Sequence, residues 1–91
     1  MTESRTSLYA KVYSRTDRDL AIVMGERIHK LRTEAELTQA QLGQKIGVTN
    51  QAIGHFERAI YLPSATSVAR LAQHLGCTAD YLLGLDEEVI R

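Results

Sequence analysis

Asn50, Gln51 and His55 are the residues of this 91-residue chain whose types and spacing point most directly to a chemistry. Side-chain amides and imidazoles both donate and accept hydrogen bonds. An amide of Asn or Gln can pair with N6 and N7 of adenine together, which discriminates against a wrong base by ~1–3 kcal/mol. These side chains are therefore suited to recognising bases through hydrogen bonds rather than to catalysis, provided that they lie together on one surface.

The first of two short helices that could position them begins after Thr38. Leu42 and Ile46 are spaced i, i+4, as on one apolar helix face. Thr38 is a suitable N-cap, and Gln41 three residues later completes a capping-box pattern. Gly47 follows directly, where a helix end favours a residue that tolerates positive φ.

The second helix is expected to begin after Thr49 and to bury Ile53 and Phe56, which are spaced i, i+3. Only a few residues separate the two helices, so they must cross sharply. Gly43 has no side chain and suits a close approach between them. This arrangement is typical of a helix-turn-helix whose second helix enters the major groove of DNA.

The rest of the chain predicts an all-α, compact five-helix bundle with an extra N-terminal helix. A first core helix over about 17–35 has an inward stripe of Leu20, Met24, Ile28, Leu31 and Ala35. Two further helices are expected over about 65–75 and after Thr78. The expected division is an extension at 1–16 with a short amphipathic helix, a domain at 17–84 and an acidic tail at 85–91.

The charge balance permits nucleic-acid binding without demanding it. The net charge is +0, whereas nucleic-acid-binding domains are usually basic. The charge is unevenly distributed, because residues 1–32 hold seven Lys and Arg against four acids, while residues 63–91 hold two against four. A basic face therefore remains compatible with the neutral total.

Several classes of protein do not fit the sequence. No apolar run approaches the ~20 residues of a membrane span, and the N-terminus lacks the apolar core of a secretory signal. The lone Cys77 cannot form an internal disulfide, which favours a reducing cytoplasm. The histidines show no metal-ligand spacing with one another or with Cys77, and no catalytic arrangement is visible. We expect no enzyme, no cofactor and no metal.

A series of short motifs in one order and spacing resembles the Cro/C1-type (XRE-like) helix-turn-helix domains of phage repressors and bacterial regulators. The resemblance covers roughly residues 22–84 and implies the lambda-repressor-like version of the bundle. Its elements are Gly25-Glu-Arg-Ile28, Leu31-Arg32, Leu37-Thr-Gln39, Leu42-Gly43, Gly47-Val-Thr49, Ile53, Phe56-Glu57, Pro63-Ser64, Leu75-Gly76 and Tyr81-Leu-Leu83.

The resemblance assigns three kinds of role. The residues expected to contact base edges are Asn50, Gln51 and His55. Those expected to contact the sugar-phosphate backbone are Gln39, Lys45, Thr49, Arg58 and Tyr61. Arg32 and Glu57 are expected to form an internal ion pair between the first core helix and the end of the recognition helix. Without the resemblance, a solvated helix face is the preferred interpretation of the first group. For Arg32 and Glu57 the alternative is two unrelated surface charges.

Two positions depart from the family pattern. Ala59 stands where Gly usually follows the recognition helix, so the left-handed cap there must be strained or replaced. Gly54 stands inside that helix where Ser is common, at a position expected to face outward. It costs ~1 kcal/mol in helix propensity and removes one possible contact.

The resulting hypothesis is a cytoplasmic, bacterial or phage-encoded transcriptional regulator, acting as a repressor. It would bind double-stranded DNA at a near-palindromic operator as a homodimer. The alternative is a protein-interaction module, or an antitoxin-type protein, that uses the same fold. A protein partner would then bind the N-terminal helix or the C-terminal tail. Two alternatives stay open for the apolar residues of these flanks, which either pack on their own domain or extend a dimer interface; they are Tyr9, Tyr13, Leu85, Val89 and Ile90.

Overall fold

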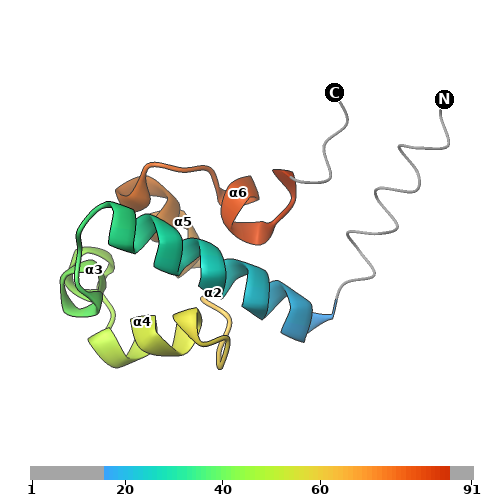
Figure 1. The fold of residues 1–91 in the computed structure, drawn as a ribbon, viewed down its shortest axis with the longest axis horizontal. Helices are drawn as coiled ribbons and strands as arrows, with labels where there is room; N and C mark the ends of the chain where they lie inside the picture. Colours follow the sequence, from blue (N-terminus) through green and yellow to red (C-terminus); the bar gives the residue numbers. More distant parts are fainter. Residues whose placement is uncertain (1–15, 87–91) are drawn as a thin grey trace, which may run out of the picture.

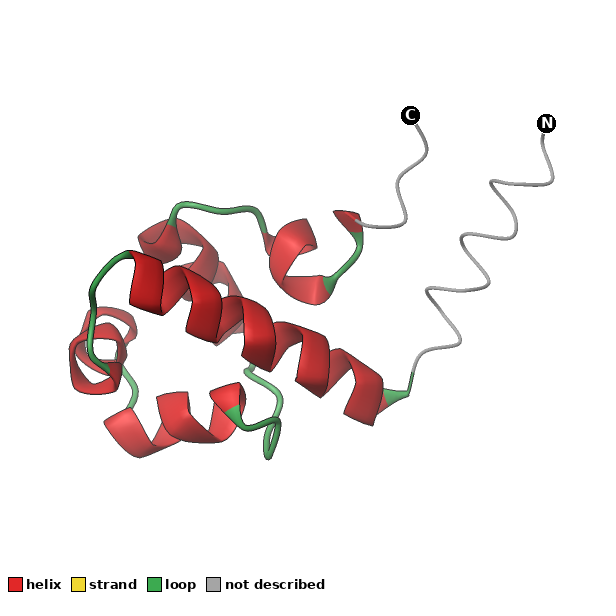
Figure 2. Ribbon diagram, in the orientation of Figure 1, coloured by secondary structure: helices red, strands yellow, loops and turns green. Residues whose placement is uncertain are grey.

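A computed structural model describes residues 16–86, and within that range the chain is all-α (Figures 1 and 2). Its helices are α2 (Asp17–Glu34), α3 (Gln39–Ile46), α4 (Asn50–Glu57), α5 (Ala65–Leu75) and α6 (Ala79–Leu83). The long α2 packs against both α4 and α6, which lie on opposite sides of it in Figure 1. The five core helices are confirmed. The expected N-terminal helix and residues 87–91 of the tail lie outside the described residues.

Side-chain caps explain where each helix begins. Every N-cap is a Ser or Thr whose hydroxyl accepts a hydrogen bond from a backbone N–H three residues later, at 3.0 or 3.1 Å. These caps are Thr16, Thr38, Thr49, Ser64 and Thr78. Each such cap contributes ~0.5–2 kcal/mol relative to alanine. The predicted helix starts are therefore correct for a local chemical reason.

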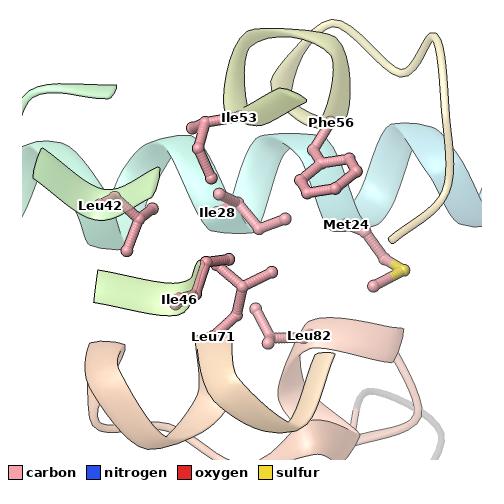
Figure 3. Packing of buried hydrophobic residues seen from close by; sticks show 8 residues of the cluster. All are labelled: Met24, Ile28, Leu42, Ile46, Ile53, Phe56, Leu71 and Leu82. Carbon is pink, nitrogen blue, oxygen red and sulfur yellow. The ribbon is translucent and has the colours of Figure 1, made fainter. Parts of the chain in front are cut away.

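The hydrophobic core takes side chains from all five helices (Figure 3). The buried cluster consists of Met24, Ile28, Leu42, Ile46, Ile53, Phe56, Leu71 and Leu82. The prediction that Ala35 belongs to the inward stripe is wrong, because this residue is exposed. α2 ends at Glu34, so Ala35 is its C-cap and has left the helical face that the stripe follows.

Two glycines let helix backbones touch. A Cβ atom at Gly43 would lie 2.6 Å from the carbonyl oxygen of Val48, so the expected close approach of α3 to the start of α4 is confirmed. Gly25 in α2 plays the same part at the other end of α4. A Cβ there would lie 2.5 Å from the carbonyl oxygen of Phe56 and 2.8 Å from that of Glu57. Main-chain contacts thus hold α4 at both ends.

The end of α4 adopts a left-handed cap without glycine. Ala59 has φ of 62°, and the N–H of Ile60 donates to the carbonyl of His55 at 2.8 Å, as in a Schellman motif. The Ala59 carbonyl accepts from Nη1 of Arg18 at 2.6 Å, which ties the loop to α2. Of the two outcomes expected for this position, the structure has the strained one.

We predict that Ala59→Gly raises the free energy of unfolding by about 0.5–1 kcal/mol. A non-glycine residue in the left-handed region costs ~1–2 kcal/mol, and glycine removes this cost. Part of the gain is offset because glycine increases the conformational entropy of the unfolded chain. Thermal unfolding should shift upward by roughly 3–6 °C. The matched control is Ala69→Gly, the same change at an exposed position inside α5, which should lower stability. A lower melting temperature for both variants would contradict the strain at Ala59.

The C-terminal part of the described chain is fastened to α2 through Arg27. Its guanidinium lies 4.3 Å from the centre of the Tyr81 ring and donates to Oδ1 of Asp86 at 2.6 Å. It also donates to the Tyr81 carbonyl. A cation over an aromatic ring together with a charge-assisted hydrogen bond keeps α6 in place over the core.

Candidate nucleic-acid interface

The outer side of α4 presents the three candidate base-reading residues together. Asn50 and Gln51 are exposed and His55 is partly exposed, whereas Ile53 and Phe56 on the other side of the helix are buried. Gln51 and His55 are neighbours at i, i+4. The hydroxyl of Thr49 accepts from the N–H of Ala52 at 3.0 Å, so this residue caps the helix that carries the polar face.

Tyr61 extends this face into the loop that follows α4. Its ring meets the His55 ring edge-on, with centroids 5.0 Å apart and planes at 86°. Such edge-to-face pairs are worth ~0.5–1.5 kcal/mol beyond the area they bury. Tyr61 is 58% exposed, so the contact leaves most of its surface available beside a candidate base-reading residue.

The remaining candidates for backbone contact come from α3 and from the end of α4. Lys45 is exposed in the last turn of α3, and Arg58 is the exposed C-cap of α4. Gln39 is only partly exposed, because its Nε2 donates to Oε1 of Glu57 at 3.1 Å. The structure therefore gives Gln39 an internal partner that the sequence does not indicate.

Arg32 and Glu57 form a nearly buried ion pair between α2 and α4. Nε of Arg32 donates to Oε2 of Glu57 at 2.6 Å and Nη2 donates to Oε1 at 3.0 Å. The Arg32 and Glu57 side chains are 12% and 6% exposed. Nη1 of Arg32 also donates to the Leu37 carbonyl at 2.8 Å. This bidentate geometry couples the last turn of α4 to α2 and to the turn before α3.

The hydrogen bonds around Glu57 set its protonation. Burial by itself raises the pKa of Glu57, but hydrogen bonds from Arg32, Gln39 and His29, together with the Arg32 charge, outweigh burial and leave the pKa lowered. The hydrogen bond to Glu57 and the charge of that carboxylate raise the pKa of Arg32, against the lowering effect of burial. Nδ1 of His29 lies 3.2 Å from Oε1 of Glu57. Sequence reasoning missed His29, for which the only signal is its i−3 spacing from Arg32.

Gly54 corrects the expected set of outward positions. It is buried rather than exposed, because the amide of Gln39 and the guanidinium of Arg58 lie over it. Position 54 faces the first turn of α3, so neighbouring side chains cover a residue that the helical pattern alone puts outside.

A metal site, a membrane-spanning helix or a reactive cysteine would indicate a different function for the described residues. Residues 16–86 contain no group of three His, Cys, Asp or Glu that could hold a metal ion. None of the helices described is long and apolar enough to cross a membrane. Cys77 is partly buried against the core, and burial raises the pKa of its thiol. This environment disfavours the reactive thiolate form.

A family model described as Helix-turn-helix matches residues 28–82. This chain belongs to that helix-turn-helix family. It is the Cro/C1-type family that the sequence motifs resemble. The match spans the C-terminal part of α2, all of α3, α4 and α5, and α6 as far as residue 82. The family comprises transcriptional regulators and is not an enzyme class.

Curated relatives in this family include a phage repressor and a bacterial regulator. Repressor protein C2 of Salmonella phage P22 is 41% identical over 61 residues, which are 67% of this chain and 28% of that repressor. The HTH-type transcriptional regulator ImmR of Bacillus subtilis is 30% identical over 64 residues, which are 70% of this chain and 50% of that protein. The chain thus spans half or less of the length of these two relatives.

Two solved structures share the helix arrangement of this chain. The P22 c2 repressor, crystallised in complex with a synthetic operator, aligns with a TM-score of 0.65 at 42% identity, covering 66% of this chain and 91% of that one. The hypothetical transcription factor NHTF from Neisseria aligns with a TM-score of 0.67 at 22% identity, covering 76% and 79%. At that identity the second likeness shows the fold alone.

Proposed function

We propose that this chain binds double-stranded DNA in a sequence-specific manner and represses transcription by occupying an operator. The observation that carries the proposal is the outer face of α4, where Asn50, Gln51 and His55 stand together while the helix is held rigidly from behind. The P22 repressor that aligns with this chain was crystallised with an operator, which supports the same use of the fold here. Such a regulator acts in the cytoplasm.

A homodimer follows from the size of the recognition element. α4 has 8 residues, which span ~12 Å, so one copy reads only a few base pairs. Specificity then calls for two half-sites whose centres lie about one helical turn, ~34 Å, apart. The corresponding operator is nearly palindromic, because the two copies are related by two-fold symmetry.

The proposed contacts divide into two groups with different consequences. Side chains that read base edges specify the sequence, and these are Asn50, Gln51 and His55. Side chains that bind sugar and phosphate fix the register without carrying sequence information, and these are Gln39, Lys45, Thr49, Arg58 and Tyr61. The Arg32–Glu57 pair positions α4 and touches no DNA.

We predict that Gln51→Ala and Lys45→Ala weaken DNA binding in different ways. Loss of the Gln51 amide should cost ~1–3 kcal/mol on the preferred site and little on random duplexes. Loss of the Lys45 charge should weaken binding to all duplexes alike and lower the salt slope by ~1. Titrations of both variants at several salt concentrations measure these effects. Equal losses on specific and random DNA from Gln51→Ala would remove this residue from the base-reading group.

A second candidate function is a protein-interaction or antitoxin-type role. The loop after α4 exposes three consecutive apolar side chains, Ile60 at 51%, Tyr61 at 58% and Leu62 at 38%. An exposed apolar cluster next to a polar face is a common feature of protein-binding surfaces. The net charge of +0 also fits a protein partner better than it fits DNA.

Enrichment of a random duplex library by the purified protein at physiological salt tests the first function against the second. Recovery of an inverted repeat with half-site centres about one helical turn apart is the expected result. Weak, salt-sensitive retention of every duplex without enrichment would reject sequence-specific binding. The loop at Ile60–Leu62 would then become the surface on which to seek a protein partner.

A further inference from the structure

The side of α4 that faces α3 carries no side chain at Gly54, and atoms of two polar side chains from different elements lie close to that position. A Cβ atom at Gly54 would lie 3.1 Å from Nη1 of Arg58 and 3.4 Å from Oε1 of Gln39. Gln39 is the first residue of α3, and Arg58 is the C-cap of α4. A guanidinium and an amide therefore both lie next to the position where a side chain at residue 54 would begin.

These two groups are equipped to hold an anion. Within residues 16–86, no carboxylate lies at ion-pair distance from Arg58. The neighbouring Glu57 is already engaged, since both of its oxygens accept from Arg32. Gln39 uses one amide hydrogen on Glu57 and keeps a second. The pair therefore offers one positive charge without an ion-pair partner among the described residues, and several N–H donors, close to Gly54.

We propose that Gln39 and Arg58 bind one DNA phosphate jointly, and that the absence of a side chain at position 54 is what allows them to converge. The inference rests on the DNA binding proposed above and adds a role for Gly54. A methyl group at this position would occupy the space in which the two groups meet. Because the end of the Arg58 side chain is flexible, the methyl group displaces the guanidinium and leaves α4 in place.

Gly54→Ala tests the inference through two effects of opposite sign. Alanine favours a helix interior over glycine, so the melting temperature should rise by about 4 °C. Binding to every duplex should nevertheless weaken about fivefold, and the slope of log affinity against log salt should fall by ~1, as for the loss of one phosphate contact. A more stable protein that binds less tightly is not explained by a damaged fold.

A double variant at positions 54 and 58 tests whether Gly54→Ala weakens DNA binding by displacing Arg58. If alanine acts by displacing Arg58, then Gly54→Ala combined with Arg58→Gln binds no more weakly than Arg58→Gln alone. Losses that multiply, or Gly54→Ala binding with unchanged affinity and salt slope, would overturn the joint site. A loss confined to the preferred sequence would overturn it too, and would assign Gly54 to the approach of a base. If the wild-type protein binds no duplex, the proposed function itself fails.

Discussion

Glu57→Ala is expected to lower the free energy of unfolding by about 3–5 kcal/mol, because it leaves the charge of Arg32 nearly buried without its partner. Arg32 is 12% exposed and is held by two charge-assisted hydrogen bonds to the carboxylate. Typical domains are stable by only ~5–15 kcal/mol, so this loss removes much of the total. Urea unfolding monitored by circular dichroism measures it.

The exposed Glu34 on α2 offers a matched control. Glu34→Ala removes the same charge at the surface and should change stability by no more than about 0.5 kcal/mol. An equally small effect of Glu57→Ala would mean that the Arg32 guanidinium becomes hydrated without destabilising the fold, which would contradict the prediction. Replacing both partners by apolar residues of similar size should be milder than either single change, because no unpaired charge then remains.

The pH dependence of the pair has a definite sign. The pKa of Glu57 is lowered in the folded protein, so its contribution to stability is complete above the ordinary glutamate value of ~4.3. The contribution is lost as the pH falls through the folded pKa. Between about pH 5 and pH 3, the wild type should therefore lose more stability than Glu57→Ala. Parallel decreases would show that Glu57 does not supply this part of the acid sensitivity.

Gly25→Ala is the second change with a large expected effect. The added Cβ would lie 2.5 Å from the Phe56 carbonyl oxygen and 2.8 Å from that of Glu57, and main-chain atoms cannot move aside as a flexible side chain can. Overpacking of this kind costs typically ~1–3 kcal/mol and occasionally more. We expect about 3 kcal/mol, even though alanine favours helices. Thermal and urea unfolding measure the loss.

Gly54→Ala is the matched control, because it makes the same change inside another helix where the nearest atoms belong to flexible side chains. It should be stabilising, whereas Gly25→Ala should be destabilising. If the two variants had the same sign, the difference between backbone and side-chain neighbours would not decide the outcome. A shift of less than about 0.5 kcal/mol for Gly25→Ala would mean that the end of α4 moves freely.

Local chemistry explains which parts of the fold the sequence predicts well. Thr38 with Gln41 and Thr49 mark helix starts because a cap depends on residues only two or three positions away. The need for a left-handed residue at Ala59 came instead from the resemblance, because the family usually has Gly at this position. Whether the cap is strained or replaced depends on the loop that follows, so the structure was needed to decide it.

Most of the contacts that the sequence did not predict join residues far apart in the chain. The contact of Gly25 with the end of α4 joins residues about thirty positions apart, and nothing around Gly25 signals it. The outward placement of Gly54 failed because α3 and Arg58 cover a position that helical periodicity leaves outside. Gln39 could be recognised as a polar group near a helix start, but its bond to Glu57 depends on how α3 and α4 cross.

The backbone contacts at Gly25 and Gly43 have a consequence for how such a protein can change over generations. α4 abuts main-chain atoms at both ends, and peptide groups keep one shape whatever side chains accompany them. Exchanges among Leu, Ile and Met in the interior would then alter the stability of the domain while leaving α4 in the same orientation. For the DNA binding proposed above, the outer residues of α4 are correspondingly free to be exchanged to suit new target sequences, without any redesign of the support beneath them.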